Sequence, residues 1–236
     1  MSLSCDLCAL ANICLPSNLT EQEVALLEQH LLTSVKIKKG EALYPAGKLF
    51  SGLYAVKSGS FKSIVSNSEG DVQIVGFHMP GELIGFDGYE SSHTSSVIAL
   101  ESSMYCKIST KHLDYLNDNI KGVSKHINVM VANDIKAHHS ALFMMARKTA
   151  EERVVCFLKN ISDRNTRRGF SNCDFSLSMP RGDIANFLGM APETISRLLA
   201  QLQDEKIVEI NRREVHICNY EELSRRSCGH NKQYNA

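Results

Sequence analysis

Hydrophobic and polar residues change their spacing several times along this chain. After an amphipathic opening, in which Thr20 and Glu23 stand at the spacing of a helix capping box, apolar residues come in short runs from about Val35 to Ile108. These runs are rich in β-prone residues, and pairs such as Lys39-Gly40 separate them. Short strands at regular spacing, with glycine between them, predict an all-β sandwich or roll.

The spacing becomes helical from about Leu113 to Met145, a stretch that contains no proline and only one glycine. Apolar residues recur there every three or four positions, which predicts a helix of about 30 residues with a seam for a partner helix. A helix packed on its own β-domain is the alternative. Asp134 and His138 interrupt the seam and would weaken association. The candidate dimerisation residues are Ile120, Ile127, Met130, Ile135, His138 and Leu142.

Beyond Lys148 the pattern indicates two helices joined by a tight turn. The segment 181–189 is typical of a helix that ends at Gly189, and Pro192 opens a second helix that runs to Gln203. This is the pattern of a helix-turn-helix, with an ordinary helical hairpin as the alternative. A β-hairpin over 207–217 would then form a wing. The residues expected to face inward are Ile184, Leu188, Ile195 and Leu199.

The outer face of the second helix carries polar residues suited to reading DNA. Glu193, Ser196 and Arg197 stand at i, i+3 and i+4, so they share one surface. An arginine there can bind guanine O6 and N7, while a carboxylate accepts a hydrogen bond from cytosine N4. The alternative is an intrahelical salt bridge between Glu193 and Arg197.

Three cysteines, Cys5, Cys8 and Cys14, crowd the start of the chain in the spacing C-x2-C-x5-C. So short a segment cannot bury three thiols in a core of its own, and clustered thiolates favour an iron–sulfur cluster, zinc or copper(I). A disulfide-bonded tail or unrelated surface thiols are the alternatives. A metal site normally wants four ligands, so the fourth must come from elsewhere in the chain.

Composition adds outer bounds to this picture. The 236 residues are enough for two domains with their own cores. No run of about 18 apolar residues predicts a transmembrane helix, and the N-terminus lacks the pattern of a signal peptide. We therefore expect a cytoplasmic protein whose eight cysteines stay reduced. The net charge is zero, but the part from Arg147 onward has 15 Lys and Arg against 12 Asp and Glu, which leans toward an anionic partner.

The order of cysteine-rich tail, β-roll, long helix and winged helix-turn-helix resembles the CRP/FNR superfamily, and within it the oxygen-sensing FNR branch. The resemblance spans Cys5 to about Ile217 and includes an isolated cysteine at Cys106. It implies an α+β fold with a cluster-binding segment (1–18), a jelly-roll-like β-roll (19–112), a dimerisation helix (113–146) and a winged helix-turn-helix (147–236). The strings that carry it are Gly76-Phe-His, Gly85-Phe-Asp, Leu100-Glu-Ser-Ser-Met-Tyr-Cys106, Ala150-Glu-Glu-Arg, Arg181-Gly-Asp-Ile and Glu193-Thr-Ile-Ser-Arg197-Leu-Leu.

The resemblance also implies a function. A [4Fe–4S] cluster on Cys5, Cys8, Cys14 and Cys106 would promote homodimerisation and binding to double-stranded DNA at TTGAT and ATCAA half-sites without oxygen. O2 would convert the cluster to a [2Fe–2S] form, weaken the dimer and release the DNA. The protein would be a regulator, not an enzyme. A winged-helix regulator with structural zinc on the same cysteines, answering another signal, is the alternative.

Two further implications concern partners. RNA polymerase would be contacted through the β-roll at Ser58, Gly70 and Asp71. The cyclic-nucleotide branch of the superfamily needs an arginine after the Gly81-Glu82 pair, and here no Arg or Lys follows until Lys107. Since a buried phosphate without a cationic partner is costly, no cyclic nucleotide is expected.

Some positions depart from the family pattern or match no ligand position. Ala9 follows Cys8 where some relatives carry a hydroxyl residue, and a changed neighbour could alter the lifetime of the cluster. His138 stands where some relatives have an acidic residue. The remaining cysteines match no ligand position, and of these Cys156 is expected in a core; they are Cys156, Cys173, Cys218 and Cys228.

Overall fold

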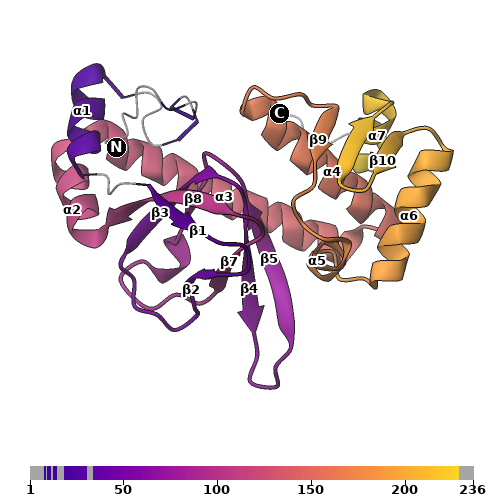
Figure 1. The fold of residues 1–236 in the computed structure, drawn as a ribbon, viewed down its shortest axis with the longest axis horizontal. Coiled ribbons are helices and arrows are strands. Elements are labelled where there is room, and N and C mark those ends of the chain that lie inside the picture. The colour runs from indigo at the N-terminus through magenta and orange to yellow at the C-terminus, as the bar shows by residue number, and fades with distance from the viewer. Residues whose placement is uncertain (1–7, 9, 12, 15–18, 31–33, 229–236) are drawn as a thin grey trace. The chain divides into compact units, whose positions relative to one another are not determined.

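The structure, a computed structural model, describes residues 8, 10–11, 13–14, 19–30 and 34–228. The chain divides into two compact units, Met1–Ile135 and Lys136–Ala236, and each is described by itself (Figure 1). None of the described helices is both long enough and apolar enough to cross a membrane. The domain boundaries expected at residues 18, 112 and 146 stay predictions.

The first unit contains two four-stranded antiparallel sheets, in the strand orders β1-β8-β3-β6 and β2-β7-β4-β5. The predicted β-roll is therefore confirmed. In Figure 1, β4 and β5 run on as a hairpin beyond the other strands of their sheet. The strands are β1 (Val35–Ile37), β2 (Ala42–Tyr44), β3 (Gly52–Ser58), β4 (Phe61–Ser66), β5 (Val72–His78), β6 (Leu83–Ile84), β7 (Ser96–Ala99) and β8 (Ser103–Ser109), with a short 3-10 turn η1 (Phe86–Gly88).

Helix α1 (Glu21–His30) begins with the predicted capping box. The Thr20 N–H donates to Glu23 Oε2 at 2.9 Å, and the Glu23 N–H donates to Thr20 Oγ1 at 3.3 Å. These reciprocal bonds satisfy two amide groups that the first turn of a helix leaves without partners, so the short helix starts at a defined residue.

The long helix expected from Leu113 to Met145 is broken at Ile120, so the prediction of one continuous helix was wrong. Helix α2 (Thr110–Asn119) ends there, and α3 (Lys121–Arg147) follows at once. Ile120 has extended backbone angles (φ −127°, ψ 92°) and is 1% exposed. The apolar spacing continues through the break because Ile120 fills the same core as the residues before it.

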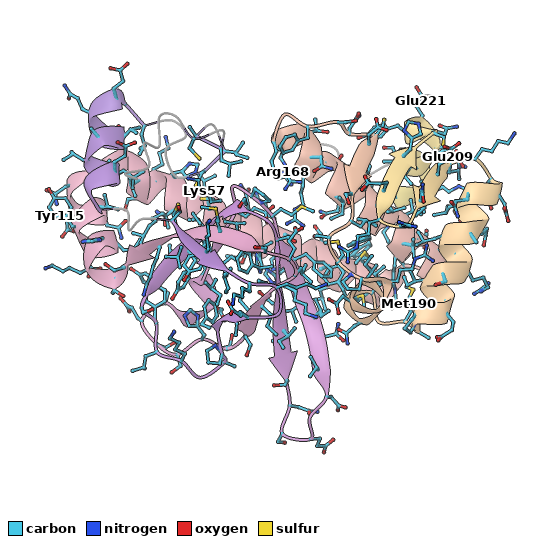
Figure 2. The ribbon with its side chains drawn as sticks, viewed as in Figure 1. Lys57, Tyr115, Arg168, Met190, Glu209 and Glu221 are labelled. Atoms are coloured by element: carbon cyan, nitrogen blue, oxygen red, sulfur yellow. The ribbon has the colours of Figure 1, made fainter. Side chains whose placement is uncertain are left out.

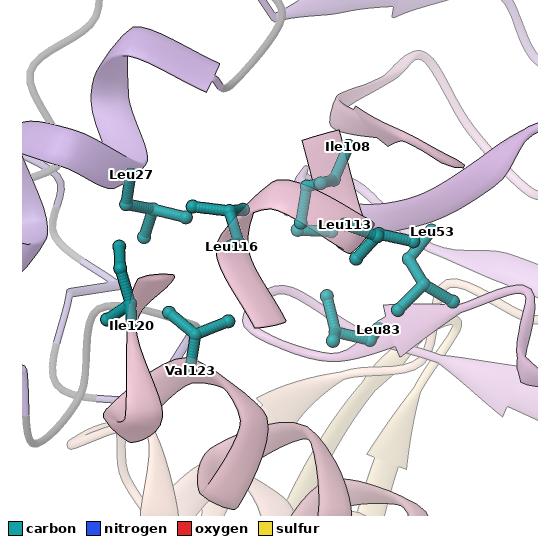
Figure 3. Close-up of a cluster of buried hydrophobic side chains, with 9 residues drawn as sticks. Leu27, Leu53, Leu83, Ile108, Leu113, Leu116, Ile120 and Val123 are labelled. Atoms are coloured by element: carbon teal, nitrogen blue, oxygen red, sulfur yellow. The ribbon is translucent and has the colours of Figure 1, made fainter. Parts of the chain in front are cut away.

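That core joins all three helices to a sheet (Figure 3). Leu27 of α1 and Leu116 of α2 point toward each other, with Ile120 and Val123 beside them. A second core lies between the sheets around Tyr44, Phe61 and Val97. The first cluster, here called the helix–sheet core, consists of Leu27, Leu53, Ala55, Leu83, Ile108, Leu113, Leu116, Ile120 and Val123.

The second unit contains the end of α3 and a winged helix-turn-helix. Helix α4 (Ala150–Arg167) comes first. The two predicted helices are α5 (Arg181–Phe187) and α6 (Pro192–Asp204), and the predicted wing strands are β10 (Val208–Asn211) and β11 (Glu214–Ile217). Two elements were not predicted. Strand β9 (Asp174–Ser176) pairs with β11 to complete a three-stranded sheet, and α7 (Tyr220–Cys228) packs on α4.

Helix α7 is tied to its neighbours by one arginine. The Arg226 guanidinium forms ion pairs with Glu151 of α4 at 3.0 Å and with Glu205, just after α6, at 2.6 Å. It also pairs with Glu222 of its own helix at 2.7 Å. Leu223 is fully buried beneath these contacts. One cation therefore links three helices of the DNA-binding unit.

Candidate functional sites

The described part of the cysteine segment folds as a tight turn. The Ala11 N–H donates to the Cys8 carbonyl at 2.9 Å, and the Cys14 N–H donates to the Leu10 carbonyl at 2.9 Å. Leu10 is 8% exposed, so the turn has an apolar anchor. Local hydrogen bonding therefore brings Cys8 and Cys14 onto one short, compact turn. Cys5 lies outside the described residues.

The turn rests on the β-roll at Gly81. A Cβ atom on Gly81 would lie 2.6 Å from Ile13 Cδ1, a distance that real contacts do not show. Gly81 also has a φ of +91°, which side chains rarely adopt. A side chain at position 81 would therefore strain the turn after β5 and require Ile13 to shift.

Cys106 stands on β8 opposite Ala55 of β3. Burial raises the pKa of its thiol, the nearby Lys57 ammonium lowers it, and the Cys8 thiol raises it. Cys8 and Lys57 are therefore both within electrostatic reach of Cys106. Lys57 extends from the last part of β3 and is half-buried (Figure 2).

The donor set fits a thiolate-bound metal in its chemistry. Cys8, Cys14 and Cys106 are half-buried thiols in no disulfide, and Cys14 and Cys106 both pack against the helix–sheet core. Soft thiolates in apolar surroundings next to one cation suit an anionic iron–sulfur cluster. Within the residues that the structure describes, no three His, Cys, Asp or Glu side chains stand close enough to hold a metal ion. The fourth predicted thiol, Cys5, is not among them.

The helix-turn-helix has the predicted geometry. Helix α5 is followed by Gly189 with a φ of +62°, and α6 begins with Pro192 in its first turn. The four predicted anchors are all buried, and they are Ile184 (3% exposed), Leu188 (0%), Ile195 (0%) and Leu199 (4%). Because these residues set the crossing of the two helices, the outer face of α6 has a fixed orientation within the unit.

The three predicted DNA-reading residues lie on that outer face. Glu193 and Arg197 are exposed, and among the described residues no ion pair joins them, so the alternative of an intrahelical salt bridge is not observed. Ser196 is half-buried, and its hydroxyl donates to the Pro192 carbonyl at 3.1 Å. The donors of Arg197 are thus directed at solvent.

The structure adds Arg181 to this face. Arg181 begins α5, and its Nη1 lies 3.5 Å from Ser196 Oγ. The sequence carried a weak signal for Arg181, because an arginine at the start of the first helix of a helix-turn-helix is suited to contact the phosphate backbone of bound DNA. Arg212 and Arg213 in the wing turn are exposed as well. Arg181, Arg212 and Arg213 therefore add positive charge to the exposed surface of this unit.

The predicted dimerisation residues separate into three groups. Ile120 is buried in the helix–sheet core of its own chain, so its assignment to the seam was wrong. Ile127 and Met130 are half-buried against the same core. The remaining residues of the seam are exposed, with Ile135 at 50% and Leu142 at 69%, and His138 is exposed between them.

The three residues predicted to contact polymerase are exposed. Ser58 ends β3, and Gly70 and Asp71 lie in the turn between β4 and β5. The side chain of Asn67 holds this turn together, because its Nδ2 donates to Asp71 Oδ2 at 2.9 Å and its Oδ1 accepts from the Asp71 N–H at 2.9 Å. Both regions are surface turns that leave the core untouched.

The remaining described cysteines and one histidine lie elsewhere in the two units. Cys156 was predicted in a core; it is half-buried on α4, and its thiol donates to the Ser227 carbonyl at 3.2 Å. Cys173 is half-buried, and the thiol of the exposed Cys218 donates to the His216 carbonyl at 3.9 Å. The His93 ring is buried and bonds to Asp87 at 3.1 Å.

Comparison with known proteins agrees with this architecture. A family model described as a Crp-like helix-turn-helix domain matches residues 152–226, and one described as a cyclic nucleotide-binding domain matches residues 34–119. The fumarate and nitrate reduction regulatory protein of Vibrio cholerae serotype O1 is 39% identical over 223 residues, covering 94% of this chain and 89% of the relative. The protein of that name from Escherichia coli K12 is 37% identical over 224 residues, covering 94% and 90%.

Solved structures share the fold as well. FixK2 from Bradyrhizobium japonicum has a TM-score of 0.75 at 27% identity, covering 81% of this chain and 95% of that chain. The two relatives and the FixK2 structure each match most of this chain, rather than a single domain.

Proposed function

The chain belongs to the CRP/FNR family of DNA-binding transcription regulators, and on that premise we propose that it responds to oxygen through a [4Fe–4S] cluster on Cys5, Cys8, Cys14 and Cys106. It is a regulator and not an enzyme. The observation that carries the proposal is that Cys14 and Cys106 pack against the same core, which brings the N-terminal cysteine segment close to β8. Without that proximity the segment would be a tail with no fourth ligand.

The cluster, when bound, supplies iron and sulfide that O2 can oxidise. The chain supplies the rest of the site. Lys57 offsets part of the negative charge that four thiolates bring, and the helix–sheet core keeps water from Cys14 and Cys106. Gly81 allows Ile13 to seat the segment on the roll. A cluster at this place ties the start of the chain to β8.

The same core provides a route from the cluster to the dimer helix. Cys14 and Cys106 pack against the side chains that also support Ile127 and Met130 of α3. Tethering the segment to β8 completes one side of this core and steadies the start of α3. Loss of the tether removes that support. A shift from mostly monomer to mostly dimer requires a differential affinity of roughly 5 kcal/mol.

The dimer forms through the exposed face of α3 that carries Ile135, His138 and Leu142. From 132 to 140 the residues of α3 are exposed, and Ile135 is among them. An exposed apolar stripe in a helix of 27 residues is suited to a second copy. An ionisable His138 in the stripe keeps the association weak.

On DNA, the dimer places two α6 helices in successive major grooves, at inverted half-sites about one helical turn apart. The half-sites are TTGAT and ATCAA. Arg197 binds the guanine, Glu193 accepts from the cytosine of the paired strand, and Ser196 lies near a thymine. Ser58, Gly70 and Asp71 contact RNA polymerase, and the protein acts in the cytoplasm without a cyclic nucleotide.

The test is iron and acid-labile sulfide in the full-length protein purified without air. We expect about four irons and as much sulfide per chain, with a spectrum that changes on exposure to air. Cys106→Ala should abolish the iron as fully as Cys8→Ala. Cys218→Ala, which removes an exposed thiol of the other unit, is the matched control and should keep it. Zinc without sulfide would overturn the proposal in favour of a structural zinc site.

A further inference from the structure

The carboxylate of Asp87 is held in the β-roll by many hydrogen bonds. It lies in η1 and accepts six hydrogen bonds, two through Oδ1 and four through Oδ2. The donors to Oδ1 are Tyr44 Oη (3.3 Å) and His93 Nδ1 (3.1 Å). The donors to Oδ2 are Thr94 N (3.1 Å), Thr94 Oγ1 (3.3 Å), Ser95 N (3.0 Å) and Ser95 Oγ (2.8 Å).

These donors are held in place by packing that does not involve Asp87. The His93 ring is 2% exposed and stacks on Tyr44 with ring centroids 3.7 Å apart. On the other side it meets Gly88, where a Cβ would lie 2.5 Å from His93 Nδ1. The ring is therefore clamped between an aromatic side chain and bare backbone, with Nδ1 aimed at the carboxylate.

The charge state of the carboxylate agrees with this geometry. Burial would raise the pKa of Asp87, but the hydrogen bonds from His93 and Ser95 outweigh it and hold the pKa below the usual value. Burial and the neighbouring carboxylate raise the pKa of Tyr44, so its hydroxyl stays a neutral donor. At neutral pH an anion therefore sits among donors only.

Two backbone amides, three hydroxyls and an imidazole converging on two oxygens are the donor set of an anion site. We propose that residues 86–95 form an anion-binding loop whose ligand is the chain's own Asp87 carboxylate. This loop lies inside the region that matches a cyclic nucleotide-binding domain. A phosphate would offer the same kind of acceptor oxygens as this carboxylate. In this loop, however, the donors already bind Asp87, and the negative charge of Asp87 would repel a phosphate.

The β-roll therefore needs no external anion to order this loop. If the Asp87 carboxylate is removed, an external anion can take its place. The Asp87 side chain is 27% exposed, so removing the carboxylate leaves its donors within reach of solvent. A small anion of the size of formate would then fill the vacated position. This inference is independent of the cluster and of oxygen.

The test is chemical rescue of full-length Asp87→Ala, measured as the melting midpoint in sodium formate against sodium chloride of equal ionic strength. We expect a lower midpoint than the wild type in chloride and a recovery that grows with the logarithm of the formate concentration. Inorganic phosphate, tested in the same way, should also stabilise the variant beyond its general effect on the wild type. Asp71→Ala is the matched control, because it removes an exposed carboxylate from the same unit, and it should respond alike to both salts.

A second variant keeps the test decisive. Adding Ser95→Ala to Asp87→Ala removes the shortest donor and should weaken the formate response severalfold. If Asp87→Ala does not fold in chloride, its refolding yield from urea should rise with formate and not with chloride. Equal effects of formate and chloride, or a formate response that Ser95→Ala leaves unchanged, would overturn the proposal.

Discussion

The side chain of Ile13 lies directly against Gly81, so that a Cβ at position 81 would come within 2.6 Å of Ile13 Cδ1. This contact joins the cysteine segment to the β-roll, although 68 positions of sequence separate the two residues. Gly81 is not a ligand, but it supports the candidate metal centre because the cysteine segment packs against it.

Gly81→Ala should therefore lift the cysteine segment off the roll. We expect Cys14 to be alkylated faster in the apo-protein and the anaerobic protein to lose iron sooner. Gly70→Ala is the matched control, because Gly70 has the same φ of +91° but nothing within 4 Å of an added Cβ. It imposes the same backbone strain without the clash. If Cys14 is alkylated equally fast in both variants, the contact between Ile13 and Gly81 does not hold the cysteine segment on the roll.

Lys57→Gln should raise the pKa of Cys106. The Lys57 ammonium favours the thiolate, whereas burial and the Cys8 thiol oppose it, so removal of the charge leaves only the opposing influences. The effect of Lys57 on this pKa should be modest, because a half-buried charge is partly screened by solvent. Alkylation of Cys106 in the apo-protein, followed by mass spectrometry against pH, measures it. Lys48→Gln, an exposed lysine of the same unit, should leave the profile unmoved.

Arg226→Ala should destabilise the DNA-binding unit by several degrees, because it releases three carboxylates that one guanidinium holds. Its ion pairs and those of Arg225 lower the pKa of Glu222 to about 2, below an ordinary value of 4.5. The stabilisation is therefore complete above pH 4.5 and disappears as the pH falls toward 2.

Thermal unfolding of the two proteins at pH 7 and at pH 3 checks this. The difference between the midpoints should be smaller at pH 3 than at pH 7, because pH 3 lies between the ordinary pKa of Glu222 and its lowered value of about 2. Arg225→Ala is the control, since Arg225 is 68% exposed and pairs only with Glu222 among the described residues. A difference between wild type and Arg226→Ala that stays constant down to pH 3 would show that packing, not charge, carries the effect.

The sequence predicted the elements whose signals are local. The anchors Ile184 and Ile195 follow from helical spacing, and the capping box of Thr20 and Glu23 follows from four residues. The break at Ile120 was missed because a buried apolar residue keeps the spacing intact while the backbone leaves the helix. Helix α7 was missed because it is short and mostly polar, and its contacts are made by Leu223 and by ion pairs to residues distant in sequence.

The candidate sites divide in the same way. Glu193, Ser196 and Arg197 share a helix face, so their spacing alone predicts that they lie together. Lys57 near Cys106, and Arg181 beside Ser196, come from neighbouring strands or helices that no spacing relates. The hydrogen bonding of Asp87 gave no sequence signal. Four of its six hydrogen bonds come from hydroxyl and amide groups of Thr94 and Ser95, which are residue types common in loops, and a fifth comes from Tyr44, which is distant in sequence.

Arg197→Ala should lose about 1–3 kcal/mol of binding at the guanine and relax specificity there. Binding to the TTGAT site and to a site with that guanine replaced, at fixed salt, gives the two affinities. The variant should bind both sites with nearly equal strength. Arg213→Ala in the exposed wing turn is the control, and it should weaken binding to both sites by the same factor. A variant Arg197→Ala that still discriminates as the wild type does would refute the assignment.

The association of α3 should respond to a single residue of its seam. His138 lies between Ile135 and Leu142 on one face, and burying an ionisable group in a dry helix interface is costly. We expect the apo-protein to be monomeric at micromolar concentration and the clustered protein dimeric. His138→Leu should shift the apo-protein toward dimer in air, because a leucine fills the stripe without a desolvation cost. Ser140→Leu adds an equal apolar side chain on nearly the opposite face, since successive residues are about 100° apart, and should not shift it. Sedimentation equilibrium of the wild-type apo-protein, the wild-type clustered protein and the two apo variants measures the association of each. A stable wild-type apo dimer with full affinity for DNA would mean that the cluster does not control association.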